Sequence, residues 1–365
     1  MMDGEAGGRL LIGNLDAEIE IARARTPGPH PGLSAAAARL VGAAASHMAL
    51  LGRSGDRMWL PAPAPPEELC AVARERGLVI ETGSLEQVAP AGDVCAWAET
   101  DTVARLRRDT SLASGDGSAN ARGELAALAT SDDWHAALWR LWPEAEVAQR
   151  VNHRGFALAL ALERGWALPA ARVVRDVEEL ERHLAAGASG AGLDGAWVLK
   201  APLSAAGRER MRHRGDDIGR GDRVRIERLL ARFGELLFEP WVDRVEDLAC
   251  AGLVHPAGVR VFSPHRLDND PRGVFRAAII DDAATSGPIV EHRDAVEAAA
   301  RAAGETLSAA GYLGPFSVDA YVWRDPTGAP RLQPMSEINA RLSFGLLARI
   351  AAEDAGASGV FELRL

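Results

Sequence analysis

The stretch Gly314-Pro-Phe-Ser-Val-Asp-Ala-Tyr-Val-Trp323, together with Met335-Ser-Glu-Ile-Asn-Ala-Arg341, decides how the rest of the sequence is interpreted. The segment between them contains Asp325-Pro-Thr-Gly328, whose proline and glycine suit a tight turn. We therefore expect two strands, Phe316–Trp323 and Arg331–Ile338, joined as an antiparallel hairpin.

Three oxygen-bearing side chains of this hairpin are candidates for a metal site. Glu337 and Asn339 are two residues apart, so they point to the same face of their strand, and pairing across the turn can bring Asp319 beside them. Mg²⁺ prefers hard oxygen ligands and keeps several waters, so one or two carboxylates and an amide oxygen suffice. The hairpin is therefore a candidate Mg²⁺ site. The alternative is a half-exposed hairpin whose polar residues face solvent.

A single lysine, Lys200, occurs among the 41 basic residues of the chain. It ends the apolar stretch Trp197-Val-Leu-Lys200, which predicts a strand. The Ala- and Gly-rich composition suggests a coding bias that replaces lysine by arginine wherever a positive charge alone is enough. Lys200 is then a candidate for a role that needs a compact point charge and that a planar guanidinium does not fill. The alternative is chance survival on the surface.

Four segments, in this order, closely resemble the motifs of the ATP-grasp superfamily, and the resemblance covers about residues 120 to 350. The segments are Val151-Asn-His-Arg-Gly-Phe156 before a helix and Leu168-Pro169; Val198-Leu-Lys-Ala-Pro202 before a Ser/Gly loop; Phe238-Glu-Pro-Trp-Val242 before Glu246-Asp247; and Asp319 with Glu337-Ile-Asn-Ala-Arg341. The specificity of the resemblance comes from the occurrence of all four motifs in the family's order.

The resemblance implies ATP and Mg²⁺ as cofactors and gives a set of residues their expected roles. For the nucleotide, Lys200 would contact the phosphates, Ser204 to Arg208 with Gly207 would form a flap over them, Glu239, Trp241 and Val242 would hold adenine through backbone groups and apolar contact, and Glu246, or less readily Asp247, would take the ribose. For the reaction, Asp319, Glu337 and Asn339 would hold Mg²⁺, and Arg341 would stabilise the transferred phosphoryl group.

The sequence departs from the family pattern at two places. A second lysine is usual near the entry segment, and here His153-Arg154 stands instead, so Arg154 is the expected substitute. The flap also lacks a dense glycine run. Substrate carboxylates in this family are often bound between the hinge and the hairpin, where Arg276 lies inside an apolar strand and is the best candidate. The other basic residues there are Arg260, His255, His265 and Arg266, and for the last three a solvated loop is the favoured interpretation.

The first 120 residues alternate short apolar strands with helices, which predicts a small Rossmann-like parallel α/β unit. No GxGxxG follows its first strand, so no dinucleotide is assigned to it. Ser111–Gly123 is the expected linker or mobile loop, and Ser204–Gly221 is expected to be mobile. The expected fold class is thus α/β of the ATP-grasp type. The N-terminal domain spans 1–120 and the ATP-grasp domain spans 121–365, with a small lid at about 170–240 and ATP gripped between two α+β subdomains.

Composition excludes several other classes of protein. The net charge of −10 argues against a nucleic-acid surface, which needs a basic face. The three cysteines are far apart and form no CxxC pair, so neither a disulfide framework nor a thiolate zinc site is expected. Neither a secretory signal nor a run of about 20 apolar residues is visible, so we expect a cytoplasmic protein without membrane contact.

These observations together predict an ATP- and Mg²⁺-dependent enzyme that joins a carboxylate to an amine, such as an amino acid, through an acyl-phosphate. Its partners would be these small molecules, and the family suggests a homodimer. Three alternatives stay open: an ATP-grasp phosphotransferase without ligation, a nucleotide-binding module that has lost turnover, and a plain structural α/β protein. Neither the carboxylate nor the nucleophile can be read from the sequence.

Overall fold

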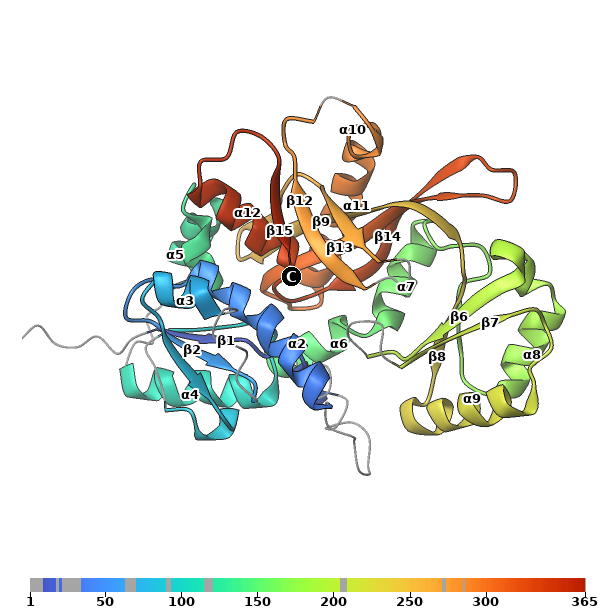
Figure 1. The fold of residues 1–365 in the computed structure, drawn as a ribbon, viewed down its shortest axis with the longest axis horizontal. Coiled ribbons are helices and arrows are strands. Elements are labelled where there is room, and N and C mark those ends of the chain that lie inside the picture. The colour runs from blue at the N-terminus through green and yellow to red at the C-terminus, as the bar shows by residue number, and fades with distance from the viewer. Residues whose placement is uncertain are drawn as a thin grey trace, which may run out of the picture.

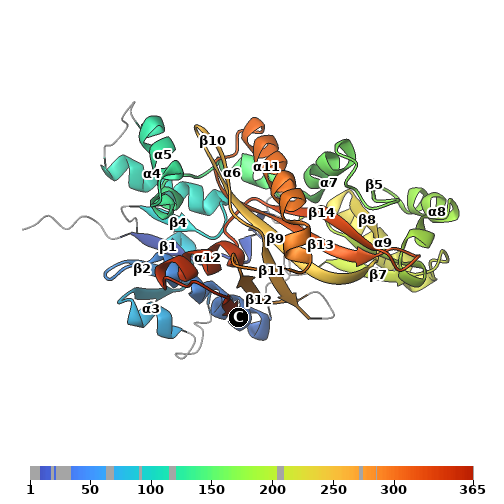
Figure 2. The ribbon, with the colours of Figure 1, turned by 90° about the horizontal axis from the view of Figure 1, so that it is seen from above.

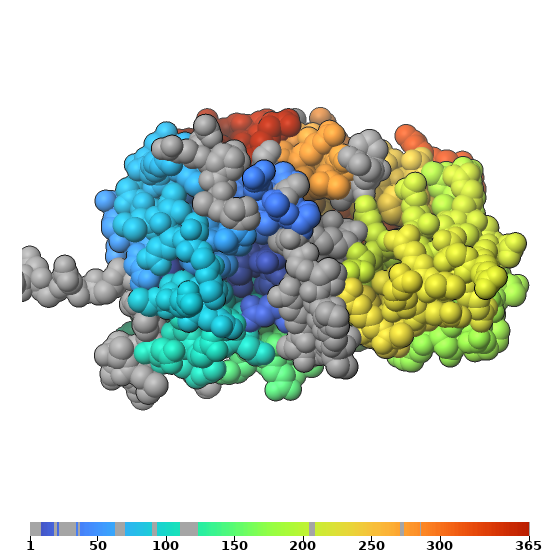
Figure 3. Space-filling model, turned by 60° about the horizontal axis from the view of Figure 1, so that its bottom comes forward, coloured from blue at the N-terminus to red at the C-terminus, as the bar shows by residue number. Residues whose placement is uncertain are grey.

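The computed structural model describes residues 9–17, 20–21, 34–62, 70–89, 93–114, 121–203, 209–270, 274–284 and 286–364. Three sheets organise the chain: a parallel sheet in the N-terminal part, a small antiparallel sheet, and a larger antiparallel sheet that holds the predicted hairpin. The N-terminal sheet and the small sheet lie at opposite ends of the molecule, with α6 (Ala145–Val151) and α7 (Arg154–Glu163) between them (Figure 1). Figure 3 shows the same two ends from another side.

The N-terminal sheet is parallel, in the order β3-β2-β1-β4. Its strands are β1 (Leu10–Ile12), β2 (Arg57–Leu60), β3 (Val79–Thr82) and β4 (Val94–Ala96), and the helices around it are α2 (Ala35–Ala45), α3 (Ala71–Glu75) and α4 (Asp101–Ser114). β1 and β4 are fully buried apolar triplets. β1 is a central strand, and β4 is an edge strand that is nevertheless covered. The predicted Rossmann-like parallel unit is therefore present.

The small antiparallel sheet has the order β5-β8-β6-β7 and one face covered by helices. Its elements are β5 (Arg172–Val174), α8 (Val177–Ala185), β6 (Ala196–Lys200), β7 (Arg210–Arg214), α9 (Arg220–Phe233) and β8 (Leu236–Pro240). Trp197, Leu199 and Phe238 pack on the helices. Because side chains alternate along a strand, Val198, Lys200 and Glu239 point to the opposite face, toward the rest of the molecule.

The large sheet has the order β14-β13-β9-β11-β12-β15, with β10 paired to β9. Its strands are β9 (Asp243–His255), β10 (Gly258–Val261), β11 (His265–Asn269), β12 (Phe275–Ile280), β13 (Gly314–Arg324), β14 (Pro330–Asn339) and β15 (Phe361–Arg364). The helix α11 (Arg293–Ala309) packs on one face through alanine and valine side chains (Figure 2). The helix α12 (Phe344–Asp354) packs on the other face.

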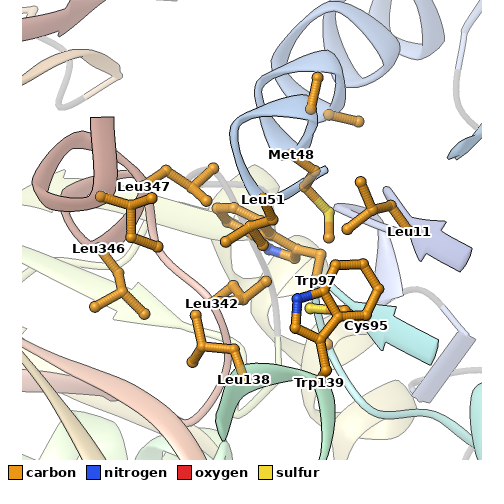
Figure 4. Close-up of a cluster of buried hydrophobic side chains, with 14 of the residues drawn as sticks. Leu11, Met48, Leu51, Cys95, Trp97, Leu138, Trp139, Leu342, Leu346 and Leu347 are labelled. Atoms are coloured by element: carbon orange, nitrogen blue, oxygen red, sulfur yellow. The ribbon is translucent and has the colours of Figure 1, made fainter. Parts of the chain in front are cut away.

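The N-terminal unit and the last helix share one apolar core. Leu11 of β1 and Trp97, which follows β4, belong to the same buried cluster as Leu342, Leu346 and Leu347 at and before the start of α12 (Figure 4). Each fully buried leucine contributes about 1.5–3 kcal/mol through removal of apolar surface from water. The N-terminal unit is thereby fixed against the end of the predicted hairpin, which is where the candidate site begins.

The structure confirms the mixed α/β class and differs from the sequence-based expectations in detail. The stretch Ser111–Gly123, predicted to be a linker, is helical up to Ser114, and α5 (Ala121–Thr130) begins within it. Likewise β7 and the start of α9 occupy part of the stretch predicted to be mobile, Ser204–Gly221. The boundaries of the N-terminal and lid domains stay predictions. No described helix is both long and apolar enough to cross a membrane.

Candidate active site

The hairpin β13–β14 brings the three predicted oxygen ligands onto one face of the large sheet. Asp319 is the direct cross-strand partner of Glu337. Asn339 donates from Nδ2 to Asp319 Oδ2 at 3.2 Å. Asn339 Oδ1 in turn accepts from Arg341 Nη2 at 3.0 Å. Two carboxylates, an amide and a guanidinium thus form one continuous polar group at the end of β14.

The two carboxylates have opposite electrostatic surroundings. Burial, reinforced by the facing Glu337 carboxylate, raises the pKa of Asp319 to about 7. Burial acts to raise the pKa of Glu337 as well, but the cations Arg154 and Lys200 outweigh it and hold that pKa below its usual range. Two facing carboxylates repel each other, so a cation bound between them would favour the ionised form of both.

Cations from three separate segments surround this pair. Arg154, at the start of α7, donates from Nη2 to Glu337 Oε1 at 3.0 Å and from Nη1 to the carbonyl of Ala201 at 2.6 Å. Lys200, at the end of β6, is hydrogen-bonded through Nζ to Glu239 Oε2. Arg341 follows β14. Arg154 and Lys200 therefore link the small sheet, α7 and the hairpin across the interface between the two antiparallel sheets.

The donor set fits Mg²⁺ better than a metal that needs an all-protein cage. Among the described residues no three or more His, Cys, Asp and Glu side chains are grouped so as to hold a metal. The site instead offers the Asp319 and Glu337 carboxylates and the Asn339 amide oxygen. Mg²⁺ is commonly held by one or two carboxylates plus substrate phosphates and water. The residues therefore suit a magnesium ion that arrives with a phosphorylated ligand.

An apolar patch lies between the two antiparallel sheets beside the charged groups. It joins Leu237 and Val242 from the small-sheet side to Tyr321 and Trp323 of β13. The backbone of Trp241 is already used: its N–H donates to Ala196 at 2.8 Å and its carbonyl accepts from Leu193 at 2.7 Å. The N–H of Trp241 is therefore already engaged, while its ring stacks on Arg212. The adenine-binding role expected for Glu239, Trp241 and Val242 stays a prediction.

Comparison with known proteins gives matches of structure only. No protein-family model and no curated protein sequence matches the chain. The biotin carboxylase domain of the 2-oxoglutarate carboxylase from Hydrogenobacter thermophilus, in complex with MgADP, ADP and bicarbonate, matches 93% of this chain and 65% of its own at 16% identity and a TM-score of 0.50. Pyruvate carboxylase from Rhizobium etli matches 96% of this chain and 27% of its own, at 16% identity and a TM-score of 0.50. N5-carboxyaminoimidazole ribonucleotide synthetase from Thermus thermophilus matches 92% of this chain and 72% of its own, at 15% identity and a TM-score of 0.47.

The two matches at a TM-score of 0.50 extend over nearly the whole chain, from the N-terminal sheet to the hairpin. The chain has the ATP-grasp fold. The predicted fold class is thus confirmed. Within the ATP-grasp fold, the charged cluster lies where the small sheet and the large sheet face each other.

The acid predicted to bind ribose, Glu246, lies on the face of β9 opposite to Asp319. Glu246 pairs with Val322, on the face that α11 covers, and its Oε2 is buried without a hydrogen-bond partner among the described residues. Asp247 pairs with Tyr321, on the same face as Asp319, and accepts from Arg244 at 3.0 Å. The pairing of β9 with β13 is regular from Glu246 onward, so strand alternation places Asp247 on the face of Asp319. The register shifts only before Glu246, where Val245 has no partner on β13.

The remaining sequence-predicted residues are partly outside the site. Ser204 and Gly207 of the expected flap lie outside the described residues. Arg276 is exposed near the start of β12, and its side chain makes no hydrogen bond or ion pair with the rest of the described chain. Arg260 holds the carbonyls of Ala129 and Ser131, which is a structural role. The roles proposed for Arg276 and the flap stay predictions.

The histidines assigned to solvated loops are buried instead. His255 ends β9 and His265 begins β11, and they are 5% and 1% exposed. Arg266, assigned with them, is a half-buried strand residue of β11. A Cβ atom on Gly345 of α12 would come within 1.9 Å of His265 Nε2, so this glycine allows the helix to pack on the ring. A strand pairing and a glycine contact 80 residues apart carry no local sequence signal.

We expect His265 to make the protein acid-sensitive. Burial and the nearby Arg349 lower the pKa of His265 to about 3, and Asp282 only partly opposes them. The unfolded chain binds a proton near pH 6.5, so the folded state is favoured above that pH and loses stability as the pH falls toward 3, by about 1.4 kcal/mol for each pH unit. Denaturant unfolding between pH 7 and pH 4.5 gives the free energy of unfolding as a function of pH. For His265→Phe the slope of this dependence should be smaller than that of the wild type by the equivalent of about one proton. An unchanged slope, or the same change in His135→Gln, would contradict this assignment.

Proposed function

We propose that this protein is an ATP- and Mg²⁺-dependent ligase that joins a carboxylate to an amine through an acyl-phosphate intermediate. The observation that carries the proposal is the group formed by Asp319, Glu337 and Asn339 on one sheet, met by Lys200 and Arg154 from elements facing it. Negative ligands for a metal lie beside positive side chains suited to phosphates. Such a pairing is what the transfer of a phosphoryl group requires.

The first step makes a mixed anhydride. An oxygen of the substrate carboxylate attacks the γ-phosphorus of ATP, the bond from phosphorus to the β–γ bridging oxygen breaks, and ADP leaves. Lys200 and Arg154 neutralise the phosphate oxygens, and Arg341 neutralises the transferred phosphoryl group. Positioning and charge neutralisation supply most of the catalysis in such transfers, so no general base is needed.

The second step makes the new bond. The amine nitrogen attacks the acyl carbon, inorganic phosphate leaves, and the nitrogen gives a proton to solvent or to the departing phosphate. Arg341 stays beside the phosphate during this step. When bound, Mg²⁺ supplies charge stabilisation to the phosphate oxygens, and Asp319, Glu337 and Asn339 would hold it.

The nucleotide base and ribose would lie at the interface of the two antiparallel sheets. The apolar patch that contains Val242 and Leu237 would receive adenine, with Glu239 beside it. Asp247 is our candidate for the ribose hydroxyls, in place of Glu246. The N-terminal unit would close the substrate side of the site near Arg341.

Thermal unfolding with and without Mg·ATP tests the proposal without knowledge of the substrates. A ligand that binds only the folded state at 100 times its Kd stabilises by about 2.7 kcal/mol, which raises the Tm by several degrees. No rise at saturating Mg·ATP would refute the proposal. If the Tm rises, carboxylates and amines are screened for ADP release. Release that needs both substrates supports ligation, release with one substrate alone indicates a phosphotransferase, and binding without release from any pair indicates lost turnover.

The two neighbouring acids of β9 give a matched pair of variants. We expect Asp247→Asn to weaken ATP binding by about 10-fold, because hydrogen bonds to a charged group contribute about 1.5–3 kcal/mol. Glu246→Gln should leave ATP affinity unchanged, since its side chain faces α11. Titration calorimetry measures the affinity of each variant for ATP and for 2′-deoxy-ATP, which lacks one of the ribose hydroxyls. Equal loss in the two variants, or loss only in Glu246→Gln, would contradict the assignment of the ribose to Asp247.

A further inference from the structure

One asparagine side chain holds the segment that carries Asn339 and Arg341 directly, and a second holds a neighbouring loop that contacts it. Asn152, which follows α6, pairs with both backbone groups of Ala340: its Nδ2 donates to the Ala340 carbonyl at 3.1 Å and its Oδ1 accepts the Ala340 N–H at 2.9 Å. The same Nδ2 donates to Ala148 at 2.8 Å, which ties the side chain to α6. Asn152 thus contacts the residue between the expected metal ligand and the expected catalytic arginine.

A second asparagine supports the same segment from the N-terminal sheet. Asn14, after β1, donates to the carbonyl of Ala98 at 2.9 Å and accepts the Ala98 N–H at 3.2 Å. The neighbouring carbonyl of Trp97 accepts the N–H of Leu342 at 3.0 Å. The Arg341 guanidinium lies 5.5 Å from the Trp97 ring centre. Figure 4 shows Trp97 and Leu342 in the core that the N-terminal unit shares with α12.

These contacts replace the sheet ladder where it stops. β14 ends at Asn339, and its pairing with β13 ends at Ser317–Asn339, so the backbone of residues 340–342 is not paired in the sheet. An asparagine amide offers one donor and one acceptor, as a neighbouring strand would. The backbone on both sides of Arg341 is therefore fixed, by Asn152 before it and by Trp97 after it. Small displacements of such a group are costly, since about 1 Å of misplacement can lower a rate by about 10².

We propose that Asn152 and Asn14 are positioning residues that set the place of Asn339 and Arg341, and that the N-terminal unit acts on the reaction through this connection. The inference rests on the proposed function, because it takes Asn339 as a ligand of Mg²⁺. Neither asparagine touches the nucleotide or the metal. Their effect passes through the backbone of Ala340 and Leu342.

The test measures ADP affinity by calorimetry in Mg²⁺ and in EDTA. Asn152→Leu keeps the approximate volume and removes both bonds to Ala340. It should weaken ADP binding in Mg²⁺ by about 10-fold, because Asn339 is then no longer held in place to bind the metal. Binding in EDTA should not change. Asn14→Leu acts on Leu342 only through Ala98 and Trp97, so it should weaken ADP binding in Mg²⁺ by only about 3-fold and leave binding in EDTA unchanged. Asn152→Ala serves if the leucine variant does not fold.

A matched control and a double-mutant cycle separate positioning from stability. Asp56→Asn weakens the pair with Arg9 at the amino ends of β1 and β2 and touches no residue of 339–342, so it should lower the Tm and leave the Mg²⁺-dependent affinity unchanged. Asn339→Ala should remove most of the effect of Asn152→Leu, because both act on one ligand.

The outcomes separate the inference from the proposed function. Wild-type-like affinity in Asn152→Leu, equal loss in Mg²⁺ and EDTA, or full additivity with Asn339→Ala would overturn the inference while the proposed function stands. Absence of Mg·ADP binding in the wild type would overturn the proposed function, and the inference with it.

Discussion

Replacing Lys200 by alanine is expected to lower ADP-forming turnover by about 10² to 10³, the usual cost of removing one preorganised group that stabilises transition-state charge. The Mg·ATP-dependent rise in Tm should largely disappear in the same variant. The reason lies in the position of Lys200 on the inner face of the small sheet, where it and Arg154 are the cations that act most strongly on Glu337. Lys200→Arg should recover little, because a guanidinium does not replace a compact ammonium.

Lys200→Ala also removes the ion pair with Glu239, which lowers the stability of the folded state whether or not ATP is bound there. The variant therefore needs a control that loses a comparable ion pair elsewhere. Lys200 and its partner Glu239 are 16% and 12% exposed, and Arg9 and its partner Asp56 are 19% and 4% exposed. Arg9→Met therefore leaves a similarly buried carboxylate without its partner, far from the candidate site. We expect it to lower the Tm in buffer and to keep the full rise with Mg·ATP. A Lys200→Ala protein that keeps the rise would show that the phosphates are bound elsewhere.

The parts of the site that the sequence predicted are those set by local geometry. Glu337 and Asn339 share a face because strand side chains alternate, and a turn of known chemistry brings Asp319 opposite them. The lysine at the end of β6 was found because it is the only one in the chain. Periodicity, turn residues and composition can all be read directly from the sequence, so predictions based on them do not require the tertiary structure.

The parts that the sequence did not predict depend on irregularities and long-range packing. Counting alternate residues from the hinge does not say which of Glu246 and Asp247 lies on the face of Asp319, because the unpaired residue Val245 interrupts the alternation. His265 looked like a loop residue, because nothing nearby in the sequence shows that α12 covers it. Asn152 and Asn14 were missed for the same reason, since their partners are 188 and 84 residues away.

Glu337→Gln is the second variant with a large expected effect, and it tests the metal site. Glutamine keeps the shape and the hydrogen-bonding oxygen but removes the charge, so Arg154 loses an ionic partner and Mg²⁺ loses an anionic ligand. Metal-assisted charge stabilisation contributes several kcal/mol, so turnover should fall by about 10³. ADP affinity should fall in Mg²⁺ and stay unchanged in EDTA, which calorimetry measures without any substrate.

The same hairpin provides the control for this variant. Asp325, in the turn between β13 and β14, accepts hydrogen bonds from Thr327 and Arg331, which hold its pKa at about 2. Asp325→Asn removes one carboxylate charge from the hairpin, as Glu337→Gln does, but at the end away from Asn339. It should cost stability at neutral pH, where the ionised form of Asp325 is favoured, and leave the Mg²⁺-dependent affinity unchanged. If both variants lose Mg²⁺-dependent binding equally, the hairpin acts through its stability, and the carboxylate pair Asp319–Glu337 is not the metal site.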